Sequence, residues 1–453
     1  MQEKLLTQET WSQEERAAME NEIAKHLADT DVESQSLAPV LQTKFKTTTL
    51  WGLFIVWFTA SIKAASWACG ALATTVFGLS PVSAILSLAL GNVVGGICVY
   101  IAGAMGRIGV PQSMLMIPVF GRKGAKVPQF LLYITVLGWT IANTVFSTLL
   151  GKAIVMRYFP ASMDAVVSVI IMLLLTVSSI YVANKKFDVV VKWLKPVTYL
   201  MMLILVVMTF FVVRDVDWSG KAAVTGISLP IMFISAMSAL GVGYLGTWAP
   251  FASDFTRYVN MESKAKQRKT GFISALSGWL VCTWLLGLGA LFGYMYGGID
   301  PAMHIAESIP FLAIPAIFVV LVGSWSTLVV NYISVGIDLK GLGLKVSRAK
   351  STSINAIVVV LLALVSFFGA DIATLYFRFL LFLVIWMVPW LCIQAMDYFL
   401  VAKCDYSLKG IYGLDNTYEG YNKQGIICMI VGFFASYAFC FPGDLKLFGV
   451  IPL

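Results

Sequence analysis

Long apolar stretches alternate with short polar segments along the chain after residue 46. Most of these stretches last about 20 residues or more, the length that an α-helix needs to cross the hydrocarbon core of a bilayer. A transmembrane β-barrel would instead show strands of about 10 residues with alternating polarity. The pattern therefore predicts an all-α polytopic membrane protein. Its eleven spans are expected at residues 47–79, 81–105, 127–150, 163–183, 190–213, 228–252, 270–297, 308–337, 351–369, 372–400 and 424–441.

The spans divide the chain into four regions. Residues 1–46 are polar and are interpreted as an N-terminal tail with a short amphipathic helix around residues 13–27. Residues 47–213 and 228–400 contain five spans each, and residues 401–453 form an accessory region with the eleventh. The organisation predicted is a tail, two five-helix units and a C-terminal helix region.

Composition strengthens the prediction of a membrane protein. Of the 453 residues, 59% are apolar and 12% are charged, whereas a soluble domain carries about 25% charged residues. This excludes an ordinary soluble enzyme and a disordered chain. The seven cysteines lie singly, without metal or redox spacing, so we interpret them as small apolar side chains.

The basic residues predict the orientation of the chain in the membrane. The loops after the second, fourth, sixth, eighth and tenth spans, with their flanks, hold 20 Lys and Arg residues, and the opposite loops with the C-terminal end hold five. Cytoplasmic loops are rich in Lys and Arg, so the N-terminus is expected in the cytoplasm of a multi-pass protein of the plasma or inner membrane. The net charge of +8 follows from this bias and does not indicate nucleic-acid binding.

Two spans contain residues that interrupt helices. The first span has a polar and small-residue middle at Ser61–Gly70, and the sixth holds three glycines and a proline within ten residues. Non-helical backbone at membrane depth is tolerated where it lines a cavity or is buried in protein. These spans occupy equivalent positions in the two five-helix units, which is typical of a transporter's central binding site. The alternative is that the glycines only allow close helix packing, as Gly91 and Gly95 in the second span are expected to do.

Four segments carry a resemblance to a known family. Residues 246–258, Gly-Thr-Trp-Ala-Pro-Phe-Ala-Ser-Asp-Phe-Thr-Arg-Tyr, resemble the sixth-helix signature of the nucleobase–cation symporter-1 family, nearest to its purine–cytosine permease branch. Residues 138–143, Pro389 with Asp397-Tyr398, and residues 421–425 resemble its third, tenth and eleventh helices. The resemblance implies a LeuT-type fold, an inverted repeat of two five-helix bundles with broken helices 1 and 6, followed by two helices. The family has twelve spans, whereas eleven are predicted here.

Family members import nucleobases and related heterocycles with sodium or protons. A nucleobase needs aromatic faces for stacking and polar groups at its edge. Trp139 and Asn143 share one helix face because they are four residues apart, and the resemblance implies a stacking ring and an amide contact there. Trp248 is our candidate for the opposing ring, although another alignment places that aromatic position at Leu245. The remaining candidates for the substrate site are Gly246, Thr247, Asn331, Ser66 and Lys63.

The resemblance also implies a cation site of oxygen ligands. Ser326 and Thr327 match hydroxyl ligands of sodium-binding members, and Phe58 and Ser61 would supply carbonyl oxygens. Hydroxyls in membrane helices also bond back to the preceding turn, which is the structural alternative. Sodium or a proton is expected as the coupling ion, with no other cofactor.

Lys63 departs from the family pattern. It lies midway along the first span, where a lysine is costly and usually functional. Its ammonium could take the place of the sodium ion and couple transport to protons, or it could bind an anionic substrate such as a urate-like heterocycle. Asp254 and Arg257, at the end of the sixth span, are interpreted as a helix-end ion pair or a gate contact.

These features favour a secondary active transporter over an intramembrane enzyme or a channel. The apolar spans contain no histidine, no paired aspartates and no metalloprotease motif that an enzyme would need. The expected function is import of a nucleobase, such as cytosine or a purine, by alternating access. The alternative is a related heterocycle: a hydantoin, allantoin, urate or a vitamin-type pyrimidine. The expected partners are the base, the coupling cation and the lipid bilayer, and the protein is expected to be a monomer.

Overall fold

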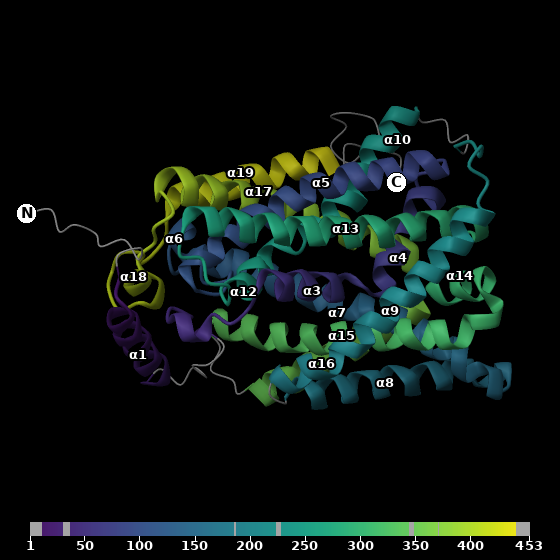
Figure 1. Ribbon diagram of the computed structural model, residues 1–453, viewed down its shortest axis with the longest axis horizontal. Coiled ribbons are helices and arrows are strands. Elements are labelled where there is room, and N and C mark those ends of the chain that lie inside the picture. The colour runs from purple at the N-terminus through teal and green to yellow at the C-terminus, as the bar shows by residue number, and fades with distance from the viewer. Residues whose placement is uncertain are drawn as a thin grey trace, which may run out of the picture.

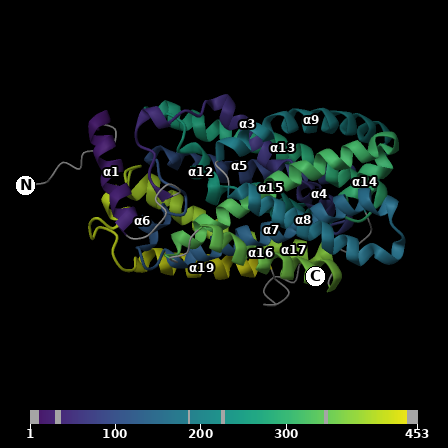
Figure 2. The same cartoon turned by 90° about the horizontal axis from the view of Figure 1, so that it is seen from below.

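The computed structural model describes residues 11–29, 37–184, 187–222, 228–343, 348–369 and 371–440. The regular structure of these parts is helical, and a single isolated β-bridge joins Thr48 to Val259. The long helices run side by side along the long axis of the molecule (Figure 1). One end, here called the N-terminal end, carries α1 (Gln13–Asp29), α6 (Met116–Phe120) and α18 (Leu408–Tyr412), and α14 (Pro301–Ser308) lies at the opposite end (Figures 1 and 2).

Every predicted span coincides with a helix or a set of consecutive helices. They are α3 (Leu50–Ser61) with α4 (Ala64–Thr75), α5 (Pro81–Met105), α7 (Lys126–Val155), α8 (Asp164–Ala183), α9 (Phe187–Asp215), α10 (Leu229–Ala236) to α12 (Ala252–Thr256), α13 (Lys264–Tyr296), α15 (Ala313–Gly341), α16 (Arg348–Gly369), α17 (Ile372–Met396) and α19 (Lys423–Cys440). Among the described residues, eight helices are long and apolar enough to cross a membrane, and the bent pair α3–α4 makes a ninth. The 29-residue α9 and the shorter apolar α19 match the other two predicted spans.

In the predicted N-terminal tail, α1 lies where a short helix was expected. Residues 1–10 and 30–36 of the predicted tail lie outside the described residues, as do residues 441–453 of the predicted C-terminal region.

The packing contacts sort the spans into two groups. In one group α13 packs on α3, α4 and α5, and α5 packs on the sixth span. In the other, α7, α8, α15 and α16 pack on one another. Each group therefore combines helices from both five-helix units, so the two units interleave instead of folding side by side.

The first and sixth spans are interrupted in different ways. α3 and α4 are bent by 63° across a two-residue break. The sixth span passes through a π-helical segment (Met237–Val242), α11 (Gly243–Gly246) and a 3₁₀ turn (Ala249–Phe251) without so sharp a bend. Pro250 is tolerated because it lies in the first turn of the 3₁₀ segment, where a missing N–H costs little.

Some glycines of the sixth span serve packing. A Cβ on Gly241 would lie 2.6 Å from the Cα of Gly91 in α5, and a Cβ on Gly91 would lie 2.2 Å from the Met237 carbonyl oxygen. The backbones of the second and sixth spans therefore touch at these two glycines, and the packing interpretation applies to them.

Candidate functional site

The eighth span, α15, stabilises the bend in the first span. Ile62 and Lys63 have extended backbone, and Lys63 forms the N-cap of α4. The N–H of Ala64 donates to the Ser324 hydroxyl of α15 at 3.0 Å. A Cβ on the neighbouring Gly323 would lie 2.0 Å from Cε of Met201 in α9 and 3.3 Å from the Ile62 carbonyl oxygen, so a glycine suits this crowded position. Protein groups thus replace the helical hydrogen bonds lost at the bend.

The Lys63 side chain points into a cluster of aromatic rings. Its Nζ lies 4.4 Å from the ring centre of Trp139, 5.0 Å from Trp248 and 5.6 Å from Tyr244. Ammonium groups are attracted to aromatic faces at these distances. We call Trp139, Tyr244 and Trp248 the aromatic cage. Lys63 is 4% exposed, and within the described part of the chain its Nζ lies over ring faces and near the thiols of Cys69 and Cys282.

Further rings fix the positions of the cage residues. Trp139 meets Tyr244 edge-to-face at 5.4 Å and Phe379 of α17 at 5.3 Å, and Trp57 of α3 meets Trp248 at 5.8 Å. Tyr376 of α17 contacts Trp139 at 6.2 Å and donates through its hydroxyl to the Ala65 carbonyl at 2.8 Å. Helices of both packing groups therefore meet at the bend.

The structure separates the two positions considered for the sixth-span aromatic. Trp248 faces Lys63, whereas Leu245 packs toward Gly95 of α5 and Gly278 of α13. Sequence reasoning did not select Tyr244 or Tyr376. Tyr244 lies in the glycine-rich stretch two residues before Gly246, which was the available signal.

The other polar candidates differ in how many of their polar atoms already have a hydrogen-bond partner in the protein. Asn143 donates to the Trp139 carbonyl at 2.8 Å, and its buried Oδ1 has no partner. The Nδ2 of Asn331 in α15 likewise has no partner. The Thr247 hydroxyl donates to the Tyr244 carbonyl at 2.6 Å, and the Ser66 hydroxyl bonds to the Ser61 carbonyl and to the Tyr244 hydroxyl. Free hydrogen-bonding capacity is therefore left on the two asparagines.

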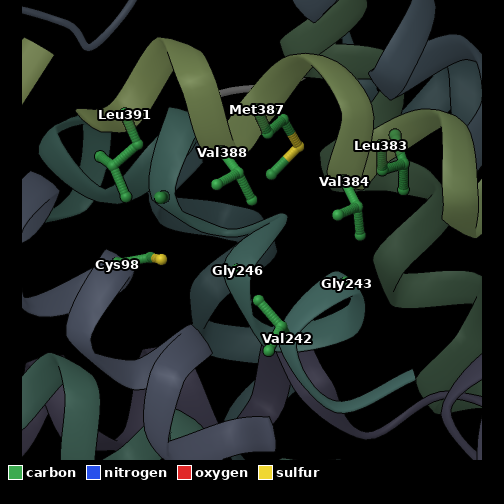
Figure 3. A pocket seen from close by; sticks show the side chains of 10 residues that line it. Cys98, Val242, Gly243, Gly246, Leu383, Val384, Met387, Val388 and Leu391 are labelled. Carbon is green, nitrogen blue, oxygen red and sulfur yellow. The ribbon is translucent and has the colours of Figure 1, made fainter. Parts of the chain in front are cut away.

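Gly246 lies at a pocket whose lining includes none of the cage residues. It lines a shallow apolar groove between α5, the sixth span and α17, together with Cys98, Val242, Gly243, Val384 and Val388 among others (Figure 3). Its lining has no charged side chain and only one weak hydrogen-bonding group, the Cys98 thiol, so it does not resemble a site for a polar heterocycle.

The predicted cation ligands lie on the two elements that meet at the bend, Phe58 and Ser61 on α3 and Ser326 and Thr327 on α15. The hydroxyls of Ser326 and Thr327 both donate to the Gly323 carbonyl, at 2.6 and 3.3 Å, which is the structural alternative foreseen for them. The Ser61 carbonyl accepts the Ser66 hydroxyl, and Phe58 is buried against Trp284. Both hydroxyls would have to turn from Gly323 to bind a cation.

At the N-terminal end, the sixth span is tied to the segments around it. Asp254 accepts the Gln112 N–H at 3.0 Å, and Arg257 donates to the Ala38 carbonyl at 3.3 Å. Asp254 also interacts electrostatically with Arg257, so the helix-end ion pair and the gate contact both stay predictions. Sequence reasoning missed Asp338 of α15, which is 6% exposed and has an unpartnered Oδ2.

The arrangement consists of groups that can bind a ligand. Within the described ranges, no three His, Cys, Asp or Glu side chains come together as a metal site. The bend brings together an ammonium group and aromatic faces at the junction of the two packing groups, and Asn143 lies one helical turn from Trp139. Such a site can bind a flat polar molecule.

Comparison with known proteins agrees with this geometry. A family model described as permeases for cytosine/purines, uracil, thiamine and allantoin matches residues 39–451. YxlA of Bacillus subtilis (strain 168), whose name places it with the purine-cytosine permeases, is 23% identical over 411 residues, 88% of this chain and 87% of its own. The purine-cytosine permease FCY2 of Saccharomyces cerevisiae is 23% identical over 58% of this chain and 49% of its own.

Solved structures support the fold. The nucleobase-cation-symport-1 family transporter Mhp1, in a closed conformation with bromovinylhydantoin bound, matches with a TM-score of 0.70 and 18% identity over 92% of this chain and 96% of its own. Its inward-facing conformation gives the same TM-score. A manganese transporter of Eremococcus coleocola matches with a TM-score of 0.54 and 11% identity over 89% of this chain and 88% of its own. The predicted fold, an all-α polytopic LeuT-type inverted repeat of two five-helix bundles, is confirmed.

Proposed function

The chain belongs to the family of permeases for cytosine/purines, uracil, thiamine and allantoin, and from that premise we propose that it imports a nucleobase, such as cytosine or a purine, together with a cation. A permease moves its substrate unchanged, so the prediction of a transporter and not an enzyme is confirmed. The proposed carrier lies in the plasma or inner membrane with its N-terminus in the cytoplasm, and works as a monomer.

The proposal rests on one observation: Trp139 and Trp248 face the same point, the Nζ of Lys63. The two rings come from the third and sixth spans, and the Lys63 Nζ lies 4.4 and 5.0 Å from them. A planar base that entered between them would stack on both faces. Stacking of a base on an aromatic side chain is worth about 1–3 kcal/mol.

The edge of the base would be recognised by the asparagines. Asn143 offers a free acceptor and Asn331 a free donor. A site that leaves polar groups unpaired without its ligand selects for the ligand that pairs them. Thr247 and Ser66 support this site by fixing Tyr244, while Gly246 supports the fold of the sixth span.

Cation coupling is proposed for the same bend. Ser326 and Thr327 would turn their hydroxyls toward the carbonyls of Phe58 and Ser61 to bind sodium, while in proton-driven transport this site would stay empty. Alternating access would follow from rocking one packing group against the other, because the site lies where both groups meet.

A related heterocycle is the second candidate. The family description includes thiamine and allantoin, and the similar Mhp1 structure holds a hydantoin. All of these are polar heterocycles that could stack between the same rings.

The test is uptake of labelled cytosine, adenine, hypoxanthine, uracil, allantoin and urate by cells that lack their own permeases, with and without sodium. Trp139→Ala and Trp248→Ala should each reduce uptake roughly 5- to 150-fold, the equivalent of the lost stacking energy. Trp51→Ala is the matched control because Trp51 is 66% exposed. Uptake that survives both cage substitutions would contradict this site.

A further inference from the structure

The Lys63 ammonium occupies the centre of the proposed substrate site without a negative partner. Its described surroundings are the faces of Trp139, Tyr244 and Trp248. The titratable groups that interact with it are the buried thiols of Cys69 and Cys282, and no carboxylate is among them. Within the described part of the chain, the ammonium form of Lys63 therefore faces aromatic rings and thiols, and no carboxylate.

We propose that Lys63 selects the charge of the substrate, which binds as an anion with its negative edge on the Lys63 ammonium. The inference rests on the proposed function and narrows its substrate class. The class is a planar oxo-purine or oxo-pyrimidine that carries an ionised ring nitrogen or a carboxylate. Urate and orotate are probes with this chemistry.

The first step of the argument is geometric. Nζ lies over both Trp139 and Trp248, so a ring that stacks between them must displace the ammonium from these faces. The displaced group stays tethered beside the ring, because Lys63 is fixed at the N-cap of α4. The ammonium and the edge of the bound ring then face each other.

The second step is energetic. A buried charge is tolerated when it is paired and hydrogen-bonded, and is costly when it loses its partners. A neutral base would remove the cation–π contacts and return only a hydrogen bond to a carbonyl oxygen. The ammonium donates a charge-assisted hydrogen bond to either acceptor, but only an anion also supplies the opposite charge that a buried ammonium needs. The fixed ammonium therefore favours the anion.

The third step concerns the transported charge. Lys63 belongs to the protein, so it balances the anion in the site without crossing the membrane. A monoanion that moves with one cation carries no net charge, whereas a neutral base with one cation carries a positive charge. Substrate-induced current distinguishes these two cases.

The experiment measures how strongly unlabelled competitors inhibit uptake of a labelled base by cells that lack other permeases. The competitors are compared in matched pairs. The first pair is orotate and uracil, because orotate is uracil with an added carboxylate. The second pair is urate and hypoxanthine. Lys63→Met should raise the half-inhibitory concentrations of orotate and urate about 10- to 150-fold, the equivalent of a lost hydrogen bond to a charged group. Those of uracil and hypoxanthine should change less than about threefold. Lys63→Arg should keep the wild-type order.

Lys152→Met is the control for removing a lysine. Lys152 pairs with Asp164 at 2.9 Å, its side chain is 29% exposed, and it lies near the end of α7 remote from the N-terminal end. This variant should keep wild-type inhibition by all four compounds. The current induced by orotate should be small in the wild-type protein, and that induced by uracil larger.

Other outcomes overturn the inference. If Lys63→Met weakens both members of each pair by the same factor, the lysine has a structural role. If only the proton dependence changes, the lysine serves coupling. Wild-type preference for uracil and hypoxanthine also overturns charge selection, while Trp139→Ala and Trp248→Ala still test the proposed function. If the expressed protein takes up no heterocycle, the proposed function itself fails.

Discussion

At the scale of single residues, position within the fold decides which polar groups matter. Ser324, Ser326 and Thr327 lie in one short stretch of α15. Sequence reasoning chose the last two, whose hydroxyls bond back to Gly323, while Ser324 alone of the three bonds to the broken span. Residue type and position along the chain do not distinguish these three hydroxyl residues. Only the approach of α15 to the bend distinguishes them.

Ser324→Ala should destabilise the protein because it leaves the Ala64 N–H buried without an acceptor. We expect a loss of about 1–3 kcal/mol in the free energy of unfolding, measured by thermal or denaturant unfolding in detergent. Ser366→Ala is the matched control, since the Ser366 hydroxyl bonds only within its own helix, to the Leu362 carbonyl. Equal stability of the two variants would contradict a role for Ser324 in holding the bend.

At the scale of elements, glycines determine which helices touch. A Cβ on Gly289 of α13 would lie 2.1 Å from the Trp67 carbonyl oxygen of α4, and a Cβ on Gly70 of α4 would lie 1.9 Å from that of Leu286. The two backbones are therefore in contact. This close crossing positions α4, and with it the Lys63 cap.

Gly289→Ala should force α4 and α13 apart. Overpacking costs typically about 1–3 kcal/mol, so the midpoint of thermal unfolding should fall clearly. Gly287→Ala serves as the control, because the nearest atom to its Cβ would be Ile85 Cγ1 at 3.9 Å. If Gly289→Ala lowers the unfolding midpoint no more than Gly287→Ala does, the crossing tolerates an added methyl group.

The short helix α14 contains a buried histidine at the end opposite the N-terminal end. His304 Nε2 lies 2.9 Å from the Gly297 carbonyl oxygen, and its ring stacks on Phe292 at 5.5 Å. Burial lowers the pKa of His304 below its usual value of 6.5. Below pH 6.5 the unfolded chain therefore binds a proton that the folded protein resists, so stability falls as the pH falls.

Thermal unfolding on either side of pH 6.5 tests this sign. The wild-type protein should lose up to about 1.4 kcal/mol of stability for each pH unit of difference between the two pKa values of His304. His304→Gln keeps a donor for Gly297 without the titration, so its stability should fall less on acidification. An identical pH dependence in both proteins would assign the effect to other groups.

At the scale of the whole molecule, the segment after α1 ties distant parts of the N-terminal end together. Glu20 of α1 accepts the N–H groups of Leu41 and Gln42. Within the same segment, Arg257 reaches the Ala38 carbonyl and the Tyr412 hydroxyl donates to the Leu37 carbonyl at 2.6 Å. The sixth span and α18 are thus linked through one stretch of chain. Opening at this end would have to release these bonds.

Glu20→Ala should loosen this connection. Two backbone N–H groups lose their acceptor, so hydrogen exchange in residues 37–46 should become roughly 5- to 150-fold faster, as expected for about 1–3 kcal/mol. Glu22→Ala is the control. Its partner Lys409 lies 3.4 Å away and both side chains are about half exposed, so this ion pair contributes little. Unchanged exchange in Glu20→Ala would contradict the connection.

Much of the fold could be predicted because each membrane span depends on the polarity and length of its own stretch of sequence. The predicted limits 81–105 and 351–369 fall within three residues of those of α5 and α16, since the bilayer requires continuous apolar helices and the flanking charges end them. The break at Ser61–Gly70 was visible for the same reason, because small and polar residues interrupt an apolar run. Trp139 and Trp248 could be selected because a stacking site needs aromatic rings.

Other features depend on contacts between distant spans. The ring that accompanies the two tryptophans, Tyr244, comes from the glycine-rich stretch, and Gly246, three residues C-terminal to Gly243, lines a groove on another side. Neither fact follows from residue type, because the π-helical segment rotates the sixth span and changes which side chains face the bend.

By itself, the sequence determined the class of protein, the spans and the presence of a lysine at membrane depth, because each depends on local polarity and length. Tertiary structure decided what that lysine faces. The bend of 63° and the approach of α7 and the sixth span place three ring faces around Nζ. Whether a buried charge meets rings, hydroxyls or carboxylates depends on packing between helices far apart in the chain.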